Sequence, residues 1–131
     1  MPAAFSRTTA LRSFIEAMPG ATSTLFSMGK AKVPVSVIHK VQGKMFAIQS
    51  LRGEEFVILK CDPTLVPALK RQYKGVGHRS HLDKRFWIAV NLDADVPIKE
   101  IRQLVSHSYG LVCAGLTRKQ QAELELATLT R

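Results

Sequence analysis

Three apolar segments follow one another in the first half of the chain, at residues 33–37, 44–49 and 56–61. Only short turns containing Gly43 and Gly53 separate them. Segments of this length that are rich in β-branched and aromatic residues and bounded by glycine turns are typical of strands. Neighbouring strands joined by such tight turns pair antiparallel. We therefore predict an antiparallel meander of three strands.

Helical signals precede and follow this meander. Apolar residues recur at helical spacing over about residues 7–18, which predicts a helix followed by a loop to about residue 32. Asp62-Pro63 is typical of a helix start, with the aspartate as cap and the proline at the first helical position. A fourth strand is expected at residues 86–92, and its Trp87, or the neighbouring Phe86 or Ile88, is expected to join the sheet to the helices.

The strongest periodicity in the chain begins near Pro97 and ends at Gly115. Apolar residues recur there three and four positions apart, which predicts a long amphipathic helix with glycine at its end. Thr117 followed by Gln120 resembles a capping box, in which the two side chains bond to each other's backbone. A final polar helix is therefore expected after Thr117.

The expected element order is α-β-β-β-α-β-α plus a C-terminal helix. Strands in a run followed by helices favour an α+β fold in two layers, with the helices on one face of an antiparallel sheet. The other face is then free to carry basic residues. A chain of 131 residues is long enough for one domain with a buried core. We expect that core at about residues 7–116 and a helical extension at 117–131.

Positive charge is concentrated in the middle of the chain. The net charge is +9, and residues 30–85 hold twelve Lys/Arg against four Asp/Glu. The remaining residues hold seven against six. Such a field favours an anionic partner such as nucleic acid, acidic lipid or a nucleotide. The alternative is a solvated basic surface that keeps the protein soluble.

A polar loop at residues 75–85 and its flanks supply six of these twelve cations and two histidines. Arg and Lys side chains that reach outward are what phosphate contacts require. The alternative for Lys70, Arg71 and Lys74 is that they form the solvent face of a helix. The predicted nucleic-acid contact set is Lys44, Lys60, Lys70, Arg71, Lys74, His78, Arg79, His81, Lys84 and Arg85.

Catalytic and metal-binding signatures are not recognised around this loop. His78, His81 and Asp83 do not follow a familiar zinc spacing, and no cysteine stands near them. Ser80, His81 and Asp83 are adjacent in a loop, whereas triads are defined by hydrogen bonds in the fold. Gly75 precedes a loop and a strand rather than a phosphate-binding helix. We expect a non-enzymatic protein with no metal and no cofactor.

Two cysteines, Cys61 and Cys113, are too few for a disulfide framework or a cysteine-based metal site. A reduced, cytoplasmic setting is the simplest interpretation. The apolar runs are also shorter than a membrane span requires, so no membrane partner is expected.

Several motifs, in this order along the chain, resemble those of the MmcQ/YjbR family. They are Gly43-Lys44-Met45-Phe46-Ala47, Leu59-Lys60-Cys61-Asp62-Pro63, His81-Leu82-Asp83-Lys84, Trp87, Leu92-Asp93, Pro97 and Ser108-Tyr109. The resemblance covers about residues 9–116. It implies a two-layer α+β fold related to the bacterial frataxin-like fold, often described as a double-wing DNA-binding architecture. The family commonly has Asn in place of Asp83 and His in place of Phe86, so no polar role is carried over to those two residues.

Our leading hypothesis is a small cytoplasmic DNA-binding protein of bacterial type, with weak sequence selectivity. Its basic patch would neutralise phosphates. The alternative is a binding module for a small anionic ligand or a protein partner, with residues 78–85 and Trp87 lining a pocket. An enzyme is the third class. A deep cavity in which His78, His81 and Asp83 converge would favour the pocket classes, and a broad basic face would favour nucleic acid.

Overall fold

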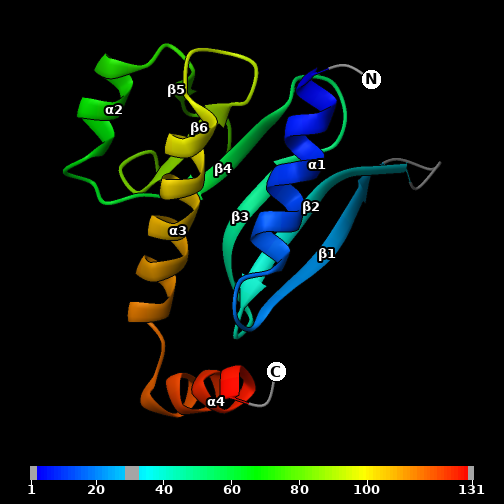
Figure 1. The fold of residues 1–131 in the computed structure, drawn as a ribbon. Helices are drawn as coiled ribbons and strands as arrows, with labels where there is room; N and C mark the ends of the chain where they lie inside the picture. The colour runs from blue at the N-terminus through cyan, green and yellow to red at the C-terminus, as the bar shows by residue number, and fades with distance from the viewer. Residues whose placement is uncertain (1–2, 29–32, 130–131) are drawn as a thin grey trace.

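The computed structural model describes residues 3–28 and 33–129. Along these ranges, α1 is followed by four strands, then by α2, two more strands and finally α3 and α4, as labelled in Figure 1. The helices are α1 (Ala3–Glu16), α2 (Val66–Gln72), α3 (Ile98–Ala114) and α4 (Arg118–Leu129). The strands are β1 (Ala21–Met28), β2 (Val33–Val41), β3 (Lys44–Ser50), β4 (Phe56–Lys60), β5 (Val76–Gly77) and β6 (Trp87–Asn91).

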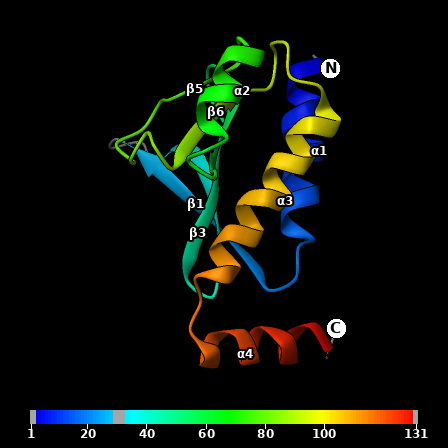
Figure 2. The same cartoon turned by 90° about the vertical axis from the view of Figure 1, so that its left-hand side faces the viewer.

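The strands form one sheet in the order β1-β2-β3-β4-β6-β5, and all neighbouring strands pair antiparallel. Helices α1 and α3 cover one face of this sheet, while the loop between β5 and β6 extends on the other side (Figure 2). We call the side away from α1 and α3 the open face. The predicted α+β fold, with an antiparallel sheet and helices packed on one face, is confirmed.

Two strands lie where the sequence predicts loops. β1 occupies residues 21–28, within the loop predicted after the first helix, and β5 occupies residues 76–77, within the predicted basic loop at 75–85. β1 is rich in serine and threonine, and it is a strand because its whole length pairs with β2. β5 contains glycine, and pairing with β6 outweighs the weak strand preference of that residue. Both strands depend on a partner distant in the sequence.

Helix α2 begins at Val66, later than the predicted start at Pro63. The Asp62 carboxylate accepts hydrogen bonds from the backbone N–H of Thr64 (2.8 Å) and from its hydroxyl (2.7 Å). It therefore closes a turn, as Asx side chains commonly do, and caps no helix. The N-cap residue of α2 is Leu65, which makes no side-chain capping bond.

The core lies between the sheet and the helices. Leu11 and Ile15 of α1 and Ile101 of α3 are fully buried in it. Phe46 of β3 meets Tyr109 of α3 edge to face, with ring centroids 5.3 Å apart. Further core residues of α3 are Leu104, Val105 and Val112, as its periodicity predicts.

Of the residues expected to join β6 to the helices, Ile88 lies in the core and Trp87 does not. Ile88 and Val90 of the same strand are core residues, and alternate residues of a strand point to opposite faces. Trp87 and Ala89 therefore belong to the open face, and Trp87 pairs there with Lys60 of β4. Ile88 is the residue of this strand that joins the sheet to the helices.

A serine of α3 completes the hydrogen bonding of the sheet at a bulge. His39 pairs with Ala47, whereas Lys40 pairs with Met45, so Phe46 is an extra residue in β3. The buried Ser108 hydroxyl donates to the Phe46 carbonyl oxygen (2.6 Å) and accepts from the Lys60 backbone N–H (2.9 Å). The Ser108 side chain therefore supplies a hydrogen-bond partner to one backbone group of β3, at the bulge, and to one of β4.

A network of hydrogen-bonded polar side chains lies between α1 and strands β1, β2 and β3. The fully buried His39 bonds through Nδ1 to the Ser23 hydroxyl (2.7 Å) and through Nε2 to Gln49 Oε1 (2.9 Å). The Gln49 amide nitrogen donates to the Thr8 carbonyl oxygen (3.2 Å). Since Gln49 Oε1 can only accept, the imidazole carries its proton on Nε2 and accepts from serine at Nδ1. The network joins α1 to three strands.

The predicted capping box is confirmed at the start of α4. The Thr117 N–H donates to Gln120 Oε1 (3.0 Å), and the Gln120 N–H donates to the Thr117 hydroxyl (3.1 Å). α4 crosses the end of the sheet, away from α2 (Figure 1). Its Leu124 packs against the core, and its Gln120 Nε2 donates to the Gln42 carbonyl oxygen (3.5 Å).

We expect the body of the protein to fold without this extension. Deleting residues 117–131 removes the partly buried Leu124 and long side-chain hydrogen bonds from Gln120 and Gln121 to backbone carbonyls of the body. The free energy of unfolding should therefore fall by at most about 2 kcal/mol. Urea unfolding of the truncated chain checks the result. Leu124→Ala in the full chain is the matched control and should reproduce most of the loss. Loss of a cooperative transition in the truncated chain would contradict the expectation.

Candidate functional site

The basic loop is the tip of a β-hairpin. β5 and β6 pair through Val76 with Val90 and Gly77 with Ala89, so residues 78–86 connect two antiparallel strands. His78 Nε2 hydrogen-bonds to the Leu82 carbonyl oxygen (2.6 Å) within this loop. The N–H groups of Phe86 and Trp87 both donate to the Asp83 carbonyl oxygen (3.0 Å each). These bonds give the loop a defined shape.

The base of the hairpin is held by Asp95. Its carboxylate accepts from the backbone N–H groups of Lys74 and Gly75, each at 2.8 Å. These two hydrogen bonds lower the pKa of Asp95. A side chain at Gly75 would approach the Ala94 Cβ to 2.9 Å, so the close contact at the hairpin base requires glycine. Sequence reasoning identified neither role.

One group of cations lies between α2 and the loop. Lys70 of α2 and Lys84 and Arg85 of the loop line a cavity of about 660 Å³. Its remaining lining is apolar, from Pro63, Val66, Pro67 and Phe86. The Arg85 guanidinium lies 5.3 Å from the centre of the Phe86 ring and forms an ion pair with Asp83 (2.7 Å). Hydrogen bonds from Arg85 lower the pKa of Asp83 to about 2.

A second group lies on the open face. Lys74, His78 and Arg79 line a smaller cavity of about 260 Å³ together with Ala89 and Asn91. The Arg79 guanidinium stacks over the Phe56 ring, 4.2 Å from its centre, and forms an ion pair with Glu54. Through these contacts the loop reaches back to the start of β4.

These two groups lie on opposite sides of the hairpin. The smaller cavity is lined by Ala89 and Asn91 of β6, which alternate with the core residues Ile88 and Val90 and so lie on the open face. The larger one is lined instead by the core residue Val66 of α2. The structure therefore divides the single predicted patch into two cation groups that flank one hairpin.

The other residues of the predicted contact set line neither of these two cavities. Arg71 is exposed on α2 and His81 is exposed in the loop. Lys60 lies on the open face at the end of β4, opposite Trp87. Lys44 lies at the β2–β3 turn, at the end of the sheet that contacts α4 and far from α2 and β5 (Figure 1). Lys44 is therefore not part of the hairpin surface.

Neither cavity brings His78, His81 and Asp83 together, since only His78 lines one of them. Within residues 3–28 and 33–129, no three His, Cys, Asp or Glu side chains form a group that could hold a metal ion. In the same ranges, no helix combines the length and the apolar character that crossing a bilayer requires.

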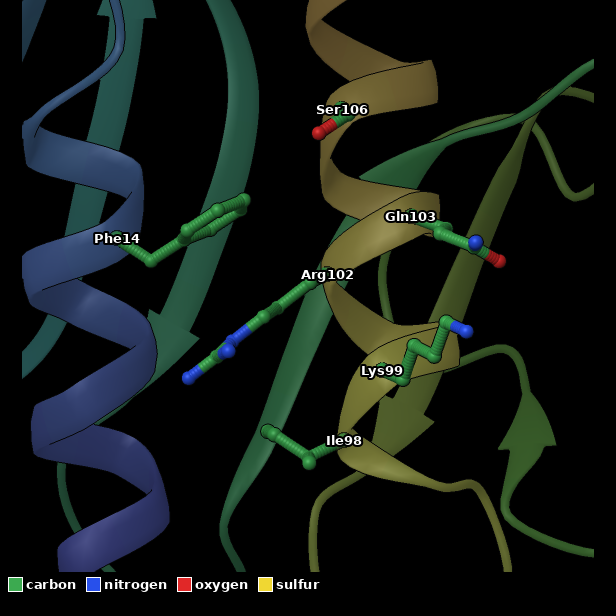
Figure 3. Close-up of a pocket in the computed structure, with 6 residues that line it drawn as sticks. All are labelled: Phe14, Ile98, Lys99, Arg102, Gln103 and Ser106. Atoms are coloured by element: carbon green, nitrogen blue, oxygen red, sulfur yellow. The ribbon is translucent and has the colours of Figure 1, made fainter.

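A third cavity, of about 410 Å³, lies between α1 and α3 (Figure 3). Phe14 and Arg102 point toward each other across it, with the guanidinium 5.7 Å from the ring centre. Lys99 and Gln103 point to the other side of α3. The lining contains two cations and no carboxylate or imidazole, so it offers no acid–base pair for catalysis.

Known proteins resemble this chain over most of its length. A family model named YjbR matches residues 16–111. The uncharacterized protein YbdF of Escherichia coli O157:H7 is 32% identical over 85 residues, which make up 64% of this chain and 70% of that protein. The family match contains the whole β5–β6 hairpin and most of α3.

Two solved structures share the fold. A Deinococcus radiodurans protein with a DUF419 domain superposes with a TM-score of 0.77 at 27% identity, covering 89% of this chain and 86% of that one. A Pseudomonas syringae protein superposes with a TM-score of 0.63 at 21% identity, covering 79% of this chain and 96% of that one. The second likeness concerns the fold alone.

Proposed function

The chain belongs to the YjbR family, and from this premise we propose that it is a non-enzymatic, cytoplasmic DNA-binding protein whose β5–β6 hairpin contacts phosphates. The observation that carries the proposal is the placement of cations on both sides of that hairpin. A two-stranded ribbon fits the major groove of B-DNA, about 12 Å wide. Cations on its two sides then lie near the phosphates of both strands.

The charges on this surface are largely available to a ligand. In the described part of the chain, the ion pairs of the hairpin surface involve Arg79 with Glu54 and Arg85 with Asp83. Lys70, Lys74 and Lys84 form no ion pair there. Contacts of this kind carry little base information, so binding should be weakly selective and governed by counterion release.

We expect duplex DNA to bind with a Kd of roughly 10⁻⁴ to 10⁻⁶ M at physiological salt, the usual range for non-specific binding. Replacing Arg79, Lys84 and Arg85 together by alanine should weaken binding to any duplex. The slope of log K against log salt should flatten by about one unit for each lost phosphate contact. Fluorescence anisotropy of a labelled duplex, titrated at low and moderate salt, measures both.

The matched control replaces Lys44, Arg118 and Lys119 by alanine. These residues are exposed and lie at the α4 end, so this variant makes the same change in net charge away from the hairpin. It should keep the affinity and the salt slope. Absence of duplex binding even at low salt would contradict the proposed function. Equal losses in the two triple variants would contradict the assignment to the hairpin.

The cavity between α2 and the loop favours a second candidate function, the binding of a small anion with an apolar body. Its volume lies within the usual range for ligand pockets, roughly 300–1,000 Å³. Its apolar floor and its rim of Lys70, Lys84 and Arg85 suit such a ligand. Phenyl phosphate is a suitable probe, and saturable NMR shifts at Lys70 and Phe86 together with no duplex binding would support this alternative.

A further inference from the structure

β1 is a long sheet edge with little protection, since its pairing with β2 is irregular only between Phe26 and Ser27. It spans eight residues, Ala-Thr-Ser-Thr-Leu-Phe-Ser-Met, and contains no charged residue and no proline. Within residues 3–28 and 33–129, its backbone hydrogen bonds go to β2 and to Met18. Figure 1 places it at the margin of the sheet, away from α2 and α3. Natural proteins usually protect such edges with charges, prolines, bulges or a covering element, because unpaired backbone groups recruit another strand.

The edge also exposes large apolar side chains on both faces of the sheet. Leu25 is 50% exposed and Phe26 is 48% exposed. They are consecutive in the strand, so one points to each face. A ligand lying on one face would cover only one of them. A strand added in the plane of the sheet would cover both and would pair the free backbone groups.

The two edges of the sheet differ strongly, and this difference points to the identity of the added strand. The opposite edge is β5, which has two residues and leads directly into the basic loop. Pairing β1 of one copy with β5 of the next would give a two-residue ladder and an open, repeating chain of molecules. Pairing β1 with β1 uses the long edge twice and closes after two copies.

The sequence of β1 is compatible with antiparallel pairing to itself. With the twofold axis at Thr24, Thr22 lies opposite Phe26 of the second copy, and Ser23 lies opposite its Leu25. No like charges meet in this register, and threonine–aromatic neighbours are favourable cross-strand pairs. The cations of the hairpin lie at the far edge of the sheet, so the two charged surfaces stay apart.

We propose that β1 pairs antiparallel with β1 of a second copy of this chain, forming a dimer with one continuous twelve-stranded sheet. The helices of both copies lie on the same face of that sheet, and the two basic hairpins lie at its ends. The inference does not rest on the proposed function, since it uses only the edge strand.

Sedimentation velocity of the full chain over a range of concentrations tests the proposal. We expect a concentration-dependent mass of two chains. Thr24→Lys places two like charges face to face at the axis and should weaken dimerisation at least tenfold. Thr24 is exposed, so the variant should keep its thermal unfolding transition. Ser13→Lys adds the same charge at an exposed position of α1 and should dimerise like the original chain.

Disulfide cross-linking tests the register. A cysteine at the axis meets its symmetry mate at a Cα separation of about 4.5–5.5 Å, which a disulfide can span. Mild oxidation should therefore link Thr24→Cys into covalent dimers, while Ser13→Cys and the unaltered chain, with its Cys113, should stay unlinked. A chain that stays monomeric at all concentrations overturns the proposal. So does a dimer that Thr24→Lys leaves intact, or one in which no cysteine at residues 23–25 cross-links.

Discussion

Replacing Ser108 by alanine should lower the free energy of unfolding by about 2–4 kcal/mol. The hydroxyl accepts a hydrogen bond from the Lys60 N–H of β4 and donates one to the carbonyl of Phe46, the extra residue of the β2–β3 bulge. Each buried backbone group left without a partner costs about 1–3 kcal/mol. The serine is fully buried, so water cannot easily substitute.

Urea unfolding followed by circular dichroism measures this loss. Ser106→Ala is the matched control, because Ser106 lies on the same helix but is exposed, and its replacement should change stability by less than about 0.5 kcal/mol. Equal free energies of unfolding for the two variants would contradict the prediction that the Ser108 hydroxyl stabilises the contact between β3 and β4.

Gln49→Leu should be similarly destabilising, by about 2–4 kcal/mol. The leucine fills most of the space but leaves the His39 Nε2–H and the Thr8 carbonyl without their partner. Both groups lie in the core, where a donor or acceptor without a hydrogen-bond partner lowers the stability of the folded state. Gln72→Leu, at an exposed position of α2, is the control and should have little effect on urea unfolding.

The same network predicts an acid-dependent stability. Burial lowers the pKa of His39 and outweighs the hydrogen bond with Gln49, which raises it. In the unfolded chain His39 titrates near 6.5, so below that pH the unfolded state binds more protons than the folded state. Stability should therefore fall as the pH is lowered from about 7.5 to about 5, above the range in which the carboxylates titrate.

His39→Gln removes the ionisable group and should remove this part of the pH dependence. Unfolding free energies measured across that pH range for both proteins provide the comparison. Parallel pH profiles for the two proteins would show that His39 is not the group responsible.

The sequence alone determined the features that depend on neighbouring residues. The long helix α3 ends at Gly115, α4 begins with the Thr117–Gln120 capping box, and the strands β2, β3 and β4 form the predicted meander. The family resemblance is confirmed as well. Helical periodicity, caps and turns each involve residues a few positions apart, so the sequence contains all the information they require.

Tertiary structure alone decided the features that depend on a distant partner. β1 and β5 are strands because β2 and β6 pair with them, although their own residues favour strands only weakly. Ile88 and Val90 of β6 pack in the core, and because side chains alternate along a strand, Trp87 lies on the open face. The same hairpin divides the predicted cations into two groups, and the position of Lys44 at the β2–β3 turn separates it from both. The reason is that strand pairing and facing are chosen by contacts across the whole fold, which no local pattern of residues specifies.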